Sequence, residues 1–146
     1  MEKITRQIDE LYEEYSRTLT EFFERMNSWE QSVVSDTGVS LAQMHLIEVI
    51  GNRGEMRMKE LAGILGVTTG TLTVMVHRLE EKGYIFRSKD AQDKRSYFIG
   101  LSERGKEEYR NHHHMHFHLI EGIVDELGKK EADAFFSRLK KLQDII

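Results

Sequence analysis

Five of the seven histidines in the chain lie within seven residues, from His112 to His118. The run is internal and is interrupted by a methionine and a phenylalanine, so it belongs to the fold and is not a terminal expression tag. On a helix, His112 and His116 project from one face and can share a metal ion. His114 and His118 form a second pair at the same spacing. Because imidazole suits zinc, copper and nickel, the run predicts a metal site.

A regulatory metal site needs a third and usually a fourth ligand from elsewhere in the chain. His45, in a second predicted helix, is the best candidate, and Glu24 and Glu30 of the first predicted helix can supply carboxylates. Zinc is one of the ions that fit this set of ligands. The residues leave another interpretation open, in which the histidines form a solvated helix face with no ligand. An unperturbed histidine has a pKa of about 6.5 and is readily hydrated.

Composition limits the fold and the class of protein. The chain has 146 residues, the size of one domain, of which 39% are hydrophobic and 32% charged. The absence of cysteine excludes disulfides and thiolate ligands, and the absence of proline lets long helices run uninterrupted. No apolar stretch is long enough to span a membrane, and the acidic N-terminus lacks the features of a signal peptide. We therefore expect a cytoplasmic protein with no membrane partner.

The net charge of −4 hides a division along the chain. Residues 1–52 carry 4 basic and 10 acidic side chains, residues 53–110 carry 12 and 9, and residues 111–146 carry 5 and 6. The middle segment alone has a positive net charge, 12 − 9 = +3, and so favours the binding of a polyanion, because phosphate binding depends on local lysine and arginine.

Apolar residues at steps of three and four predict a long first helix with one apolar stripe. The stripe consists of Ile4, Ile8, Leu11, Tyr15, Leu19, Phe22, Met26 and Trp29. Such a helix is about 40 Å long and cannot be covered by its own small domain. We expect a second copy of the chain to bury the stripe, with packing inside one chain as the alternative.

A second helix and two short helices are expected next. A turn over residues 35–40 precedes the second helix, which we expect Gly51 and Gly54 to stop. The two segments that follow, "MKELAGILG" and "TTGTLTVMVHRLEEKG", are short and amphipathic, and a single residue separates them in the sequence. They predict two helices joined by a tight turn.

The remaining residues predict a β-wing and two more helices. Residues 84–101 mix aromatic and β-branched side chains around a polar centre, which is typical of two strands and a loop. Ser102 is placed to cap a long helix that carries the histidines, and Gly128 separates that helix from the last one. The predicted fold is mainly α with a small β-wing. The predicted organisation is a single domain over 1–146, with a winged helix-turn-helix lobe over 41–101 and a helical dimerisation region over 1–34 and 102–146.

The two short helices predict a helix-turn-helix. Leu61, Ile64 and Leu65 are expected to face a core, while Gly66 lets the chain leave the first helix through a left-handed turn. Thr68 is expected to cap the second helix. Two helices joined by a three- to four-residue turn that contains glycine are typical of this motif.

The second helix presents short polar side chains on the face opposite its core positions. Leu72, Met75 or Val76, and Leu79 return at helical spacing and are expected to point inward. The residues expected to point outward are Thr69, Gly70, Thr71, Thr73, His77 and Arg78. Threonine offers a hydroxyl to a phosphate or base and a methyl to thymine, and Gly70 allows an external backbone to approach. The pattern predicts a DNA recognition helix.

The two predicted strands follow this helix directly and supply a wing. Lys89 and Lys94 lie in and beside the loop between the strands, and Arg95 follows them. Lysines can lie along the phosphate backbone while an arginine enters the narrow minor groove. Asp93 is placed to hold the guanidinium of a nearby arginine. An exposed hairpin without a ligand is the alternative, which the neighbouring helix-turn-helix disfavours.

Together these elements resemble the MarR family of bacterial transcription regulators over nearly the whole chain. The resemblance lies in "LAGILGVTTGTLTVMVHRLEEKGYIFRSKDAQDKRSYFIGLSERG". It implies a homodimer whose first and last helices interlock and whose two lobes bind palindromic double-stranded DNA. By the resemblance, Arg95 is the minor-groove arginine and Asp93 its partner. Recognition helices in successive major grooves imply half-sites about 10 base pairs apart.

Two branches of the family imply different effectors. This chain resembles the zinc-sensing branch at His45, His112 and His116. It departs from that branch at Met44 and Asn111, where a second metal site would need carboxylates. In contrast, "SLAQMHLIEVIG" is similar to members that regulate fatty-acid synthesis. In that case the histidines shape a cavity or a dimer hinge, and the effector is a lipid, an acyl group or another small molecule.

Two other classes of protein remain to be weighed. A zinc hydrolase needs only three histidines and a water, but the chain has no nucleophile motif and no glycine-rich phosphate loop, so we do not expect an enzyme. A winged helix that binds protein and not DNA is the stronger alternative. The function predicted is a homodimeric DNA-binding regulator, a repressor by preference, controlled by a metal ion or small molecule.

Overall fold

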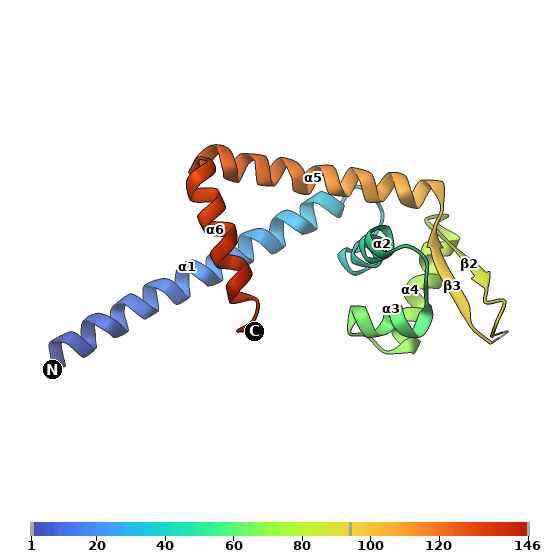
Figure 1. Ribbon diagram of the computed structural model, residues 1–146, viewed down its shortest axis with the longest axis horizontal. Helices are drawn as coiled ribbons and strands as arrows, with labels where there is room; N and C mark the ends of the chain where they lie inside the picture. Colours follow the sequence, from blue (N-terminus) through green and yellow to red (C-terminus); the bar gives the residue numbers. More distant parts are fainter. Residues whose placement is uncertain (1, 94, 146) are drawn as a thin grey trace. The chain divides into compact units, whose positions relative to one another are not determined.

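The computed structural model describes residues 2–93 and 95–145, and the side chains of residues 6–93 and 95–145. The described chain forms helices and a small sheet (Figure 1). The helices are α1 (Glu2–Val34), α2 (Leu41–Arg53), α3 (Met58–Leu65), α4 (Thr69–Glu81), α5 (Glu103–Leu127) and α6 (Lys129–Leu142), and the strands are β1 (Met56–Arg57), β2 (Ile85–Lys89) and β3 (Tyr97–Leu101). The predicted fold class, mainly α with a small β-wing, is confirmed.

The chain divides into two compact units, one ending at Leu46 and the other beginning at Ile47. The first unit contains α1, the predicted turn and the first turns of α2. The long first helix is confirmed. Its stripe is exposed from Ile8 to Phe22 and half-buried at Met26 and Trp29, and the side chain of Ile4 lies outside the described residues. The large hydrophobic side chains of α1 that are at least 41% exposed are Ile8, Leu11, Tyr12, Tyr15, Leu19, Phe22 and Phe23.

Helix α2 ends at Arg53, directly before Gly54, whose φ is +83°, so the expected stop at Gly54 is confirmed and the expected stop at Gly51 was wrong. The reason lies in the second unit. A Cβ on Gly51 would collide with the ring of Tyr109, and the Tyr109 hydroxyl donates a hydrogen bond to Oδ1 of Asn52 at 2.7 Å. Gly51 is therefore a position of close approach between α2 and α5 and not a helix stop.

Helices α3 and α4 form the predicted helix-turn-helix. Gly66 has a φ of +65°, the left-handed conformation expected of the turn. Thr68 caps α4, since its hydroxyl accepts the backbone N–H of Thr71 at 3.1 Å. The inward residues of α4 are Leu72, Val76 and Leu79, each with no exposed surface.

The expectation for Ile64 was wrong, because this side chain is 37% exposed. Leu61 and Ala62 are buried and Leu65 is half-buried. These three residues project within about 100° of one another on the helix, whereas Ile64 projects to the side of Leu61 away from the other two. The core face of α3 is therefore narrower than the apolar pattern suggested.

The strands form one antiparallel sheet in the order β1-β3-β2. Ile85 pairs with Leu101 and Lys89 with Tyr97, which makes β2 and β3 the predicted hairpin. Strand β1 was not expected, and its Met56 pairs with Ile99. Two residues are too few to show an alternating pattern in a sequence.

Helix α5 continues from β3 (Figure 1). It carries the run of histidines from His112 to His118. Ser102 caps it as predicted, because its Oγ accepts the backbone N–H of Gly105 at 3.0 Å. Gly105 packs so closely on the backbone carbonyl of Tyr84 that no side chain fits there. Gly128, with a φ of +74°, separates α5 from α6 as expected. None of the helices in the described residues has a stretch long and apolar enough to cross a membrane.

Candidate functional site

Helix α4 presents the surface that the sequence predicted. Opposite its buried face lies a continuous exposed row that begins at the N-cap and includes Thr68, Thr69, Gly70, Thr71, Thr73, His77 and Arg78, together with Val74, which is 51% exposed and was not predicted. The Thr73 hydroxyl donates to the carbonyl of Thr69 at 2.7 Å, which leaves its oxygen able to accept a further hydrogen bond. Nε2 of His77 lies 3.6 Å from Oε1 of Glu81. The exposure of the predicted residues is confirmed, and their contacts with DNA stay predictions.

Gly70 has no steric role within the described chain. A Cβ placed on it would have the Thr68 hydroxyl oxygen, at 3.9 Å, as its nearest neighbour, which is an ordinary contact. Glycine destabilises the interior of a helix by about 1 kcal/mol relative to alanine. An open glycine in the first turn of α4 therefore favours a molecule outside the chain that approaches this backbone.

The wing loop is held by Asp93, but not in the expected way. We expected its carboxylate to hold an arginine guanidinium; in the structure, Oδ1 accepts the backbone N–H of Arg95 at 3.0 Å. The carbonyl of Asp93 also accepts the backbone N–H of Ser96 at 2.9 Å. Asp93 thus shapes the turn that presents the exposed side chain of Arg95. Lys89, at the end of β2, is exposed as well, and Lys94 lies outside the described residues.

An ion pair that the sequence did not suggest attaches the wing to α3. Asp90 is only 4% exposed, and its Oδ2 accepts hydrogen bonds from Nε and Nη2 of Arg57 at 2.9 and 2.6 Å. Its other oxygen accepts the backbone N–H of Gln92 at 2.9 Å. The Gln92 N–H first, and the Arg57 guanidinium with it, lower the pKa of Asp90 below its ordinary value.

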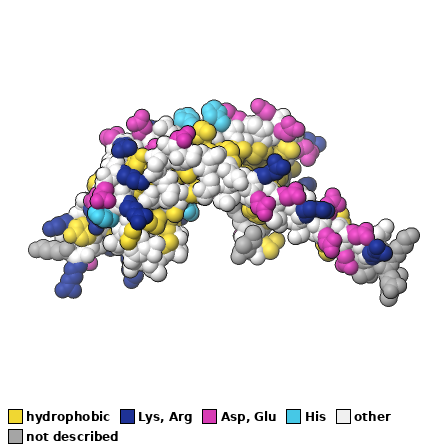
Figure 2. All heavy atoms as spheres, turned by 180° about the vertical axis from the view of Figure 1, so that it is seen from behind, with side chains coloured by type: hydrophobic (Ala, Val, Ile, Leu, Met, Phe, Trp, Pro, Cys, Tyr) yellow, Lys and Arg dark blue, Asp and Glu magenta, His cyan; other side chains and the backbone are white. Residues whose placement is uncertain are grey.

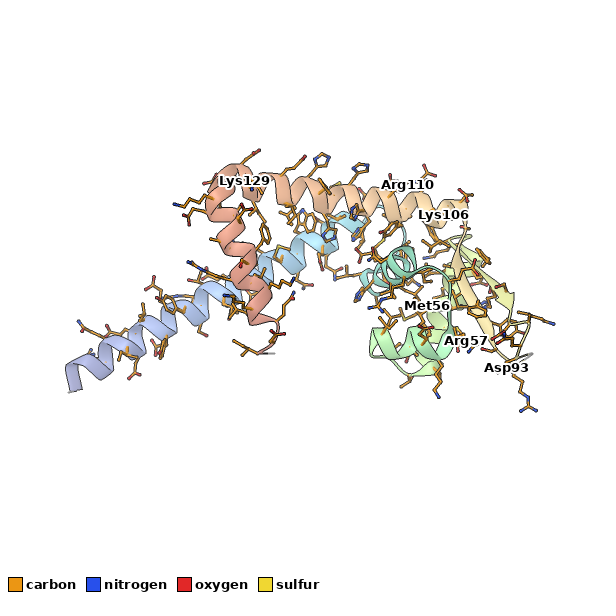
Figure 3. All side chains as sticks on the ribbon, in the orientation of Figure 1. Met56, Arg57, Asp93, Lys106, Arg110 and Lys129 are labelled. Atoms are coloured by element: carbon orange, nitrogen blue, oxygen red, sulfur yellow. The ribbon has the colours of Figure 1, made fainter. Side chains whose placement is uncertain are left out.

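Arg57 also stacks over the ring of Phe98, with its guanidinium carbon 5.3 Å from the ring centroid. Figure 3 shows Arg57 beside the hairpin and Asp93 in the loop at its end. A carboxylate at the end of a predicted strand and an arginine before a predicted helix are weak signals by themselves. Their separation of 33 positions in the sequence hides the pairing from sequence analysis.

Other arginines of the basic middle segment also serve the fold. Nε of Arg87 lies 3.0 Å from Oε2 of Glu80 and so joins β2 to α4. Nη1 of Arg104 donates to the carbonyl of Lys82 at 2.6 Å, and its guanidinium lies over the ring of Tyr84 at 4.5 Å. Part of the positive charge counted in the sequence is therefore structural. Arg78 and Arg95 are the exposed arginines on α4 and the wing.

Two of the predicted metal-ligating histidines meet on α5. His112 is 3% exposed, and its Nε2 lies 3.0 Å from Nε2 of His116. The carboxylate of Glu48 on α2 joins them, with Oε1 3.4 Å from Nε2 of His112. One ligand atom from each of the three residues lies within 4.8 Å of the other two. Glu48 was not predicted, although a glutamate inside the apolar run "LIEVI" was a signal for it.

The other candidate ligands and the second histidine pair are described separately. His45, Glu24 and Glu30 belong to the first unit, and their part in a metal site stays a prediction. Of the second predicted histidine pair, His114 and His118 are both exposed, and Nδ1 of His118 lies 3.0 Å from Oε2 of Glu121. That pair matches the solvated helix face described as the alternative.

Comparison with known proteins supports the winged-helix interpretation. The model of the MarR family matches residues 39–97. The regulator SarZ of Staphylococcus epidermidis is 30% identical over 113 residues, which are 77% of this chain and 68% of SarZ. The chain belongs to the MarR family. The regulator YcgE of Bacillus subtilis is 26% identical over 140 residues, covering 91% of this chain and 89% of YcgE.

Solved structures agree with this family assignment. The structure of FabT of Streptococcus pneumoniae in complex with DNA is 28% identical, with a TM-score of 0.84 over 92% of this chain and 96% of FabT. The regulator Tm0710 of Thermotoga maritima is 31% identical, with a TM-score of 0.67 over 90% and 92%. This MarR-family chain is a DNA-binding transcription regulator, and not an enzyme, as the sequence predicted.

Proposed function

We propose that this MarR-family protein is a homodimer that binds a palindromic operator, with α4 of each subunit in one of two successive major grooves. The observation that carries the proposal is the exposed N-terminal half of α4, where an open glycine lies among threonine side chains. Short side chains at the start of a recognition helix let its backbone approach base edges. The two half-sites are about 10 base pairs apart.

The wing supplies the second set of DNA contacts. Arg95 enters the minor groove, and Asp93 fixes the turn that carries it. Lys89 contacts the phosphate backbone, and Lys94 is assigned the same role from the sequence. The ion pair of Asp90 with Arg57 holds the wing on the lobe that contains α4, so that both contact sets keep one spacing.

Homodimer formation is supported by the apolar surface in each unit. Besides the stripe on α1, exposed large apolar side chains on α5 and α6 are Met115, Phe117, Ile120, Leu127, Phe135, Leu139 and Leu142. Figure 2 shows hydrophobic side chains at the surface among the charged ones. Patches of this extent mark protein interfaces, and a second copy of the chain is the partner that the family resemblance implies.

Repression and effector control follow from this arrangement. A dimer seated across a promoter blocks polymerase without further contacts. An effector that binds more tightly to the dimer with one separation of its two α4 helices shifts the population toward that state. The resulting change in DNA affinity is limited by how much more tightly the effector binds that state. The bacterial cytoplasm, where the operator lies, is the place of action.

A small-molecule effector has one supporting observation. An open pocket of about 410 Å³ in the second unit is lined by Ile50, Phe86, Leu101 and Tyr109, and two basic side chains, Lys106 and Arg110 of α5, and one acidic side chain, Glu55, complete its lining. Figure 3 shows Lys106 and Arg110 on the first turns of α5. An apolar body with an anionic group, such as an acyl carboxylate, matches that lining. Titrating octanoate into the protein–DNA complex tests this effector class, and unchanged DNA affinity removes it.

The DNA-binding proposal is tested by fluorescence anisotropy on a labelled duplex taken from upstream of the gene. Arg95→Ala should weaken binding by roughly tenfold or more, on cognate and scrambled DNA alike, because the minor-groove contact is not base-specific. Lys129→Ala removes one positive charge at the start of α6 and serves as the matched control. Equal affinities for wild type and Arg95→Ala would remove the wing from the interface. Absence of any salt-dependent DNA affinity in the wild type would favour a protein-binding winged helix.

A further inference from the structure

We propose that Val74 is a specificity-determining residue of α4, and that it contacts the C5 methyl group of one thymine in each half-site of the operator. From the sequence, the threonines of this helix were expected to offer methyl groups to thymine, and Val74 was not among the residues expected to point outward. The role of Val74 rests on the proposed function, in which α4 of each subunit lies in a major groove.

Val74 lies at the centre of the exposed face of α4. Its side chain is 51% exposed. Because successive residues of a helix are about 100° apart, Val74 projects almost opposite the middle of the buried face formed by Leu72, Val76 and Leu79. Gly70 lies one turn before it on the same face. A molecule that lies along the exposed face of α4 therefore meets Val74 at the middle of its contact.

Val74 is an apolar side chain on a surface that is otherwise polar or open. All side chains of α4 are described, and among them Val74 is the one large hydrophobic residue that is exposed. The exposed residues three or four positions from it are Gly70, Thr71, His77 and Arg78. Valine cannot form hydrogen bonds with base edges, whereas the C5 methyl of thymine is an apolar group in the major groove. An apolar residue at this position therefore favours thymine over the other bases.

The distribution of charge along α4 determines which part of this face can approach DNA. The helix carries no acidic side chain from Thr69 to Arg78, whereas Glu80 and Glu81 lie at its C-terminal end. Carboxylates repel phosphates, so the N-terminal part of the helix is the part that can enter the groove, as is typical of recognition helices. Val74 lies within that part, and the open Gly70 allows the close approach that a contact between methyl groups requires.

The side chain of Val74 is also rigid. Valine is branched at Cβ and adopts essentially one χ1 rotamer in a helix, so its two methyl groups are oriented before DNA binds. A contact made by them therefore loses little side-chain entropy. Thr73 is the main competitor for the same thymine, because it is adjacent and also carries a methyl group. It projects about 100° from Val74, nearer the edge of the exposed face.

An exposed valine without a DNA contact is the alternative explanation, since single apolar side chains are common on protein surfaces. The two explanations differ in what the loss of one methyl group from the DNA does. A valine without a contact does not respond to that loss. A valine in contact loses the burial of one methyl group, which weakens DNA binding by roughly fourfold for each half-site.

The test uses deoxyuridine, which differs from thymidine only by the absence of the C5 methyl group. Untagged wild-type protein first selects its preferred duplex from a pool of randomised sequences. Each thymine of that duplex, together with its symmetry mate, is then replaced with deoxyuridine, and affinity is measured by fluorescence anisotropy. We expect a symmetric pair of thymines at which the replacement weakens wild-type binding by roughly fifteenfold, fourfold for each half-site.

Val74→Ala should bind the duplexes with thymine and with deoxyuridine at this pair equally well. The variant should fold, because the position is exposed and alanine is a better helix former than valine, and thermal unfolding verifies this. Thr73→Ser is the matched control, since it removes a methyl group from the adjacent residue and keeps the hydroxyl that donates to Thr69. Whatever its own affinity for DNA, Thr73→Ser should keep the wild-type response to deoxyuridine at this pair.

Three outcomes overturn the inference. The selected duplex has no thymine in either half-site, no thymine pair loses its response in Val74→Ala, or the responsive pair loses its response in Thr73→Ser and keeps it in Val74→Ala. In each case the wild-type protein still selects a sequence, so the proposed function stands and the role of Val74 alone falls. Failure of the wild-type protein to select any sequence overturns the proposed function and the role of Val74 together.

Discussion

Asp90 accepts two hydrogen bonds from the guanidinium of Arg57, and this ion pair attaches the wing to the start of α3. The carboxylate is buried and also receives the backbone N–H of Gln92, so it is fully engaged in its ionised form. The pair stands outside the predicted DNA contacts. Its effect on DNA binding is therefore one of position, because it sets where the wing loop lies relative to α4.

Replacing Asp90 with asparagine should lower Tm at pH 7 and weaken DNA binding several-fold. Because the pKa of Asp90 is lowered in the folded state, its stabilising effect is present above the ordinary value of 3.8 and is lost as the pH falls through the lower, folded-state pKa. The difference in Tm between wild type and Asp90→Asn should then shrink below about pH 4. Asp125→Asn, an exposed change on α5, is the control. A Tm difference that stays constant from pH 7 to pH 3 would contradict the ionic role.

Gly51→Ala should destabilise the protein by about 1–3 kcal/mol, because the added methyl group meets the ring of Tyr109. Gly63→Ala, on α3, introduces the same group into open space and should stabilise by about 0.5–1 kcal/mol. Urea unfolding of both variants measures the two effects. Equal stability of the two variants would show that Tyr109 does not pack on α2 as described.

Gly70→Ala should separate stability from DNA binding. The new methyl group has room within the chain, so the free energy of unfolding should rise by about 0.5–1 kcal/mol. If the backbone of α4 approaches DNA at this position, affinity should fall roughly tenfold, about 1.4 kcal/mol. Anisotropy and urea unfolding on the same preparation give both numbers. Wild-type DNA affinity in Gly70→Ala would place the DNA elsewhere.

Leu19→Glu should convert the dimer to monomers and reduce DNA affinity with it, because it places a charge in the apolar stripe of α1. Arg17→Glu, on the opposite face of the same helix, introduces the same side chain as a control and should remain dimeric. Light scattering distinguishes the chain mass of 17.1 kDa from twice that mass. A dimeric Leu19→Glu would exclude this face as the interface.

Local patterns predicted most of the fold and of the DNA-binding surface. Apolar spacing gave α1 and the inward face of α4, and the caps Thr68 and Ser102 lie where their residue types indicated. These signals act within one or two helical turns, so a sequence contains them in full.

The features that the sequence did not reveal depend on distant contacts. Gly51 resembled a helix stop, but Tyr109 of another helix requires the glycine there. Arg57 finds Asp90 only when the wing folds back on α3. Glu48 joins His112 only when α2 packs against α5, which is why His45, with the more familiar ligand chemistry, was predicted in its place.

The central claim, sequence-specific DNA binding by a MarR-family dimer, is tested most directly by comparing two duplexes. Wild-type protein is titrated onto DNA from upstream of its own gene and onto a scrambled duplex of the same composition, at several salt concentrations. We predict affinity for the upstream duplex that is roughly a thousandfold tighter or more, and a decrease in both affinities as salt rises. Equal affinity for the two duplexes at every salt concentration would contradict the claim.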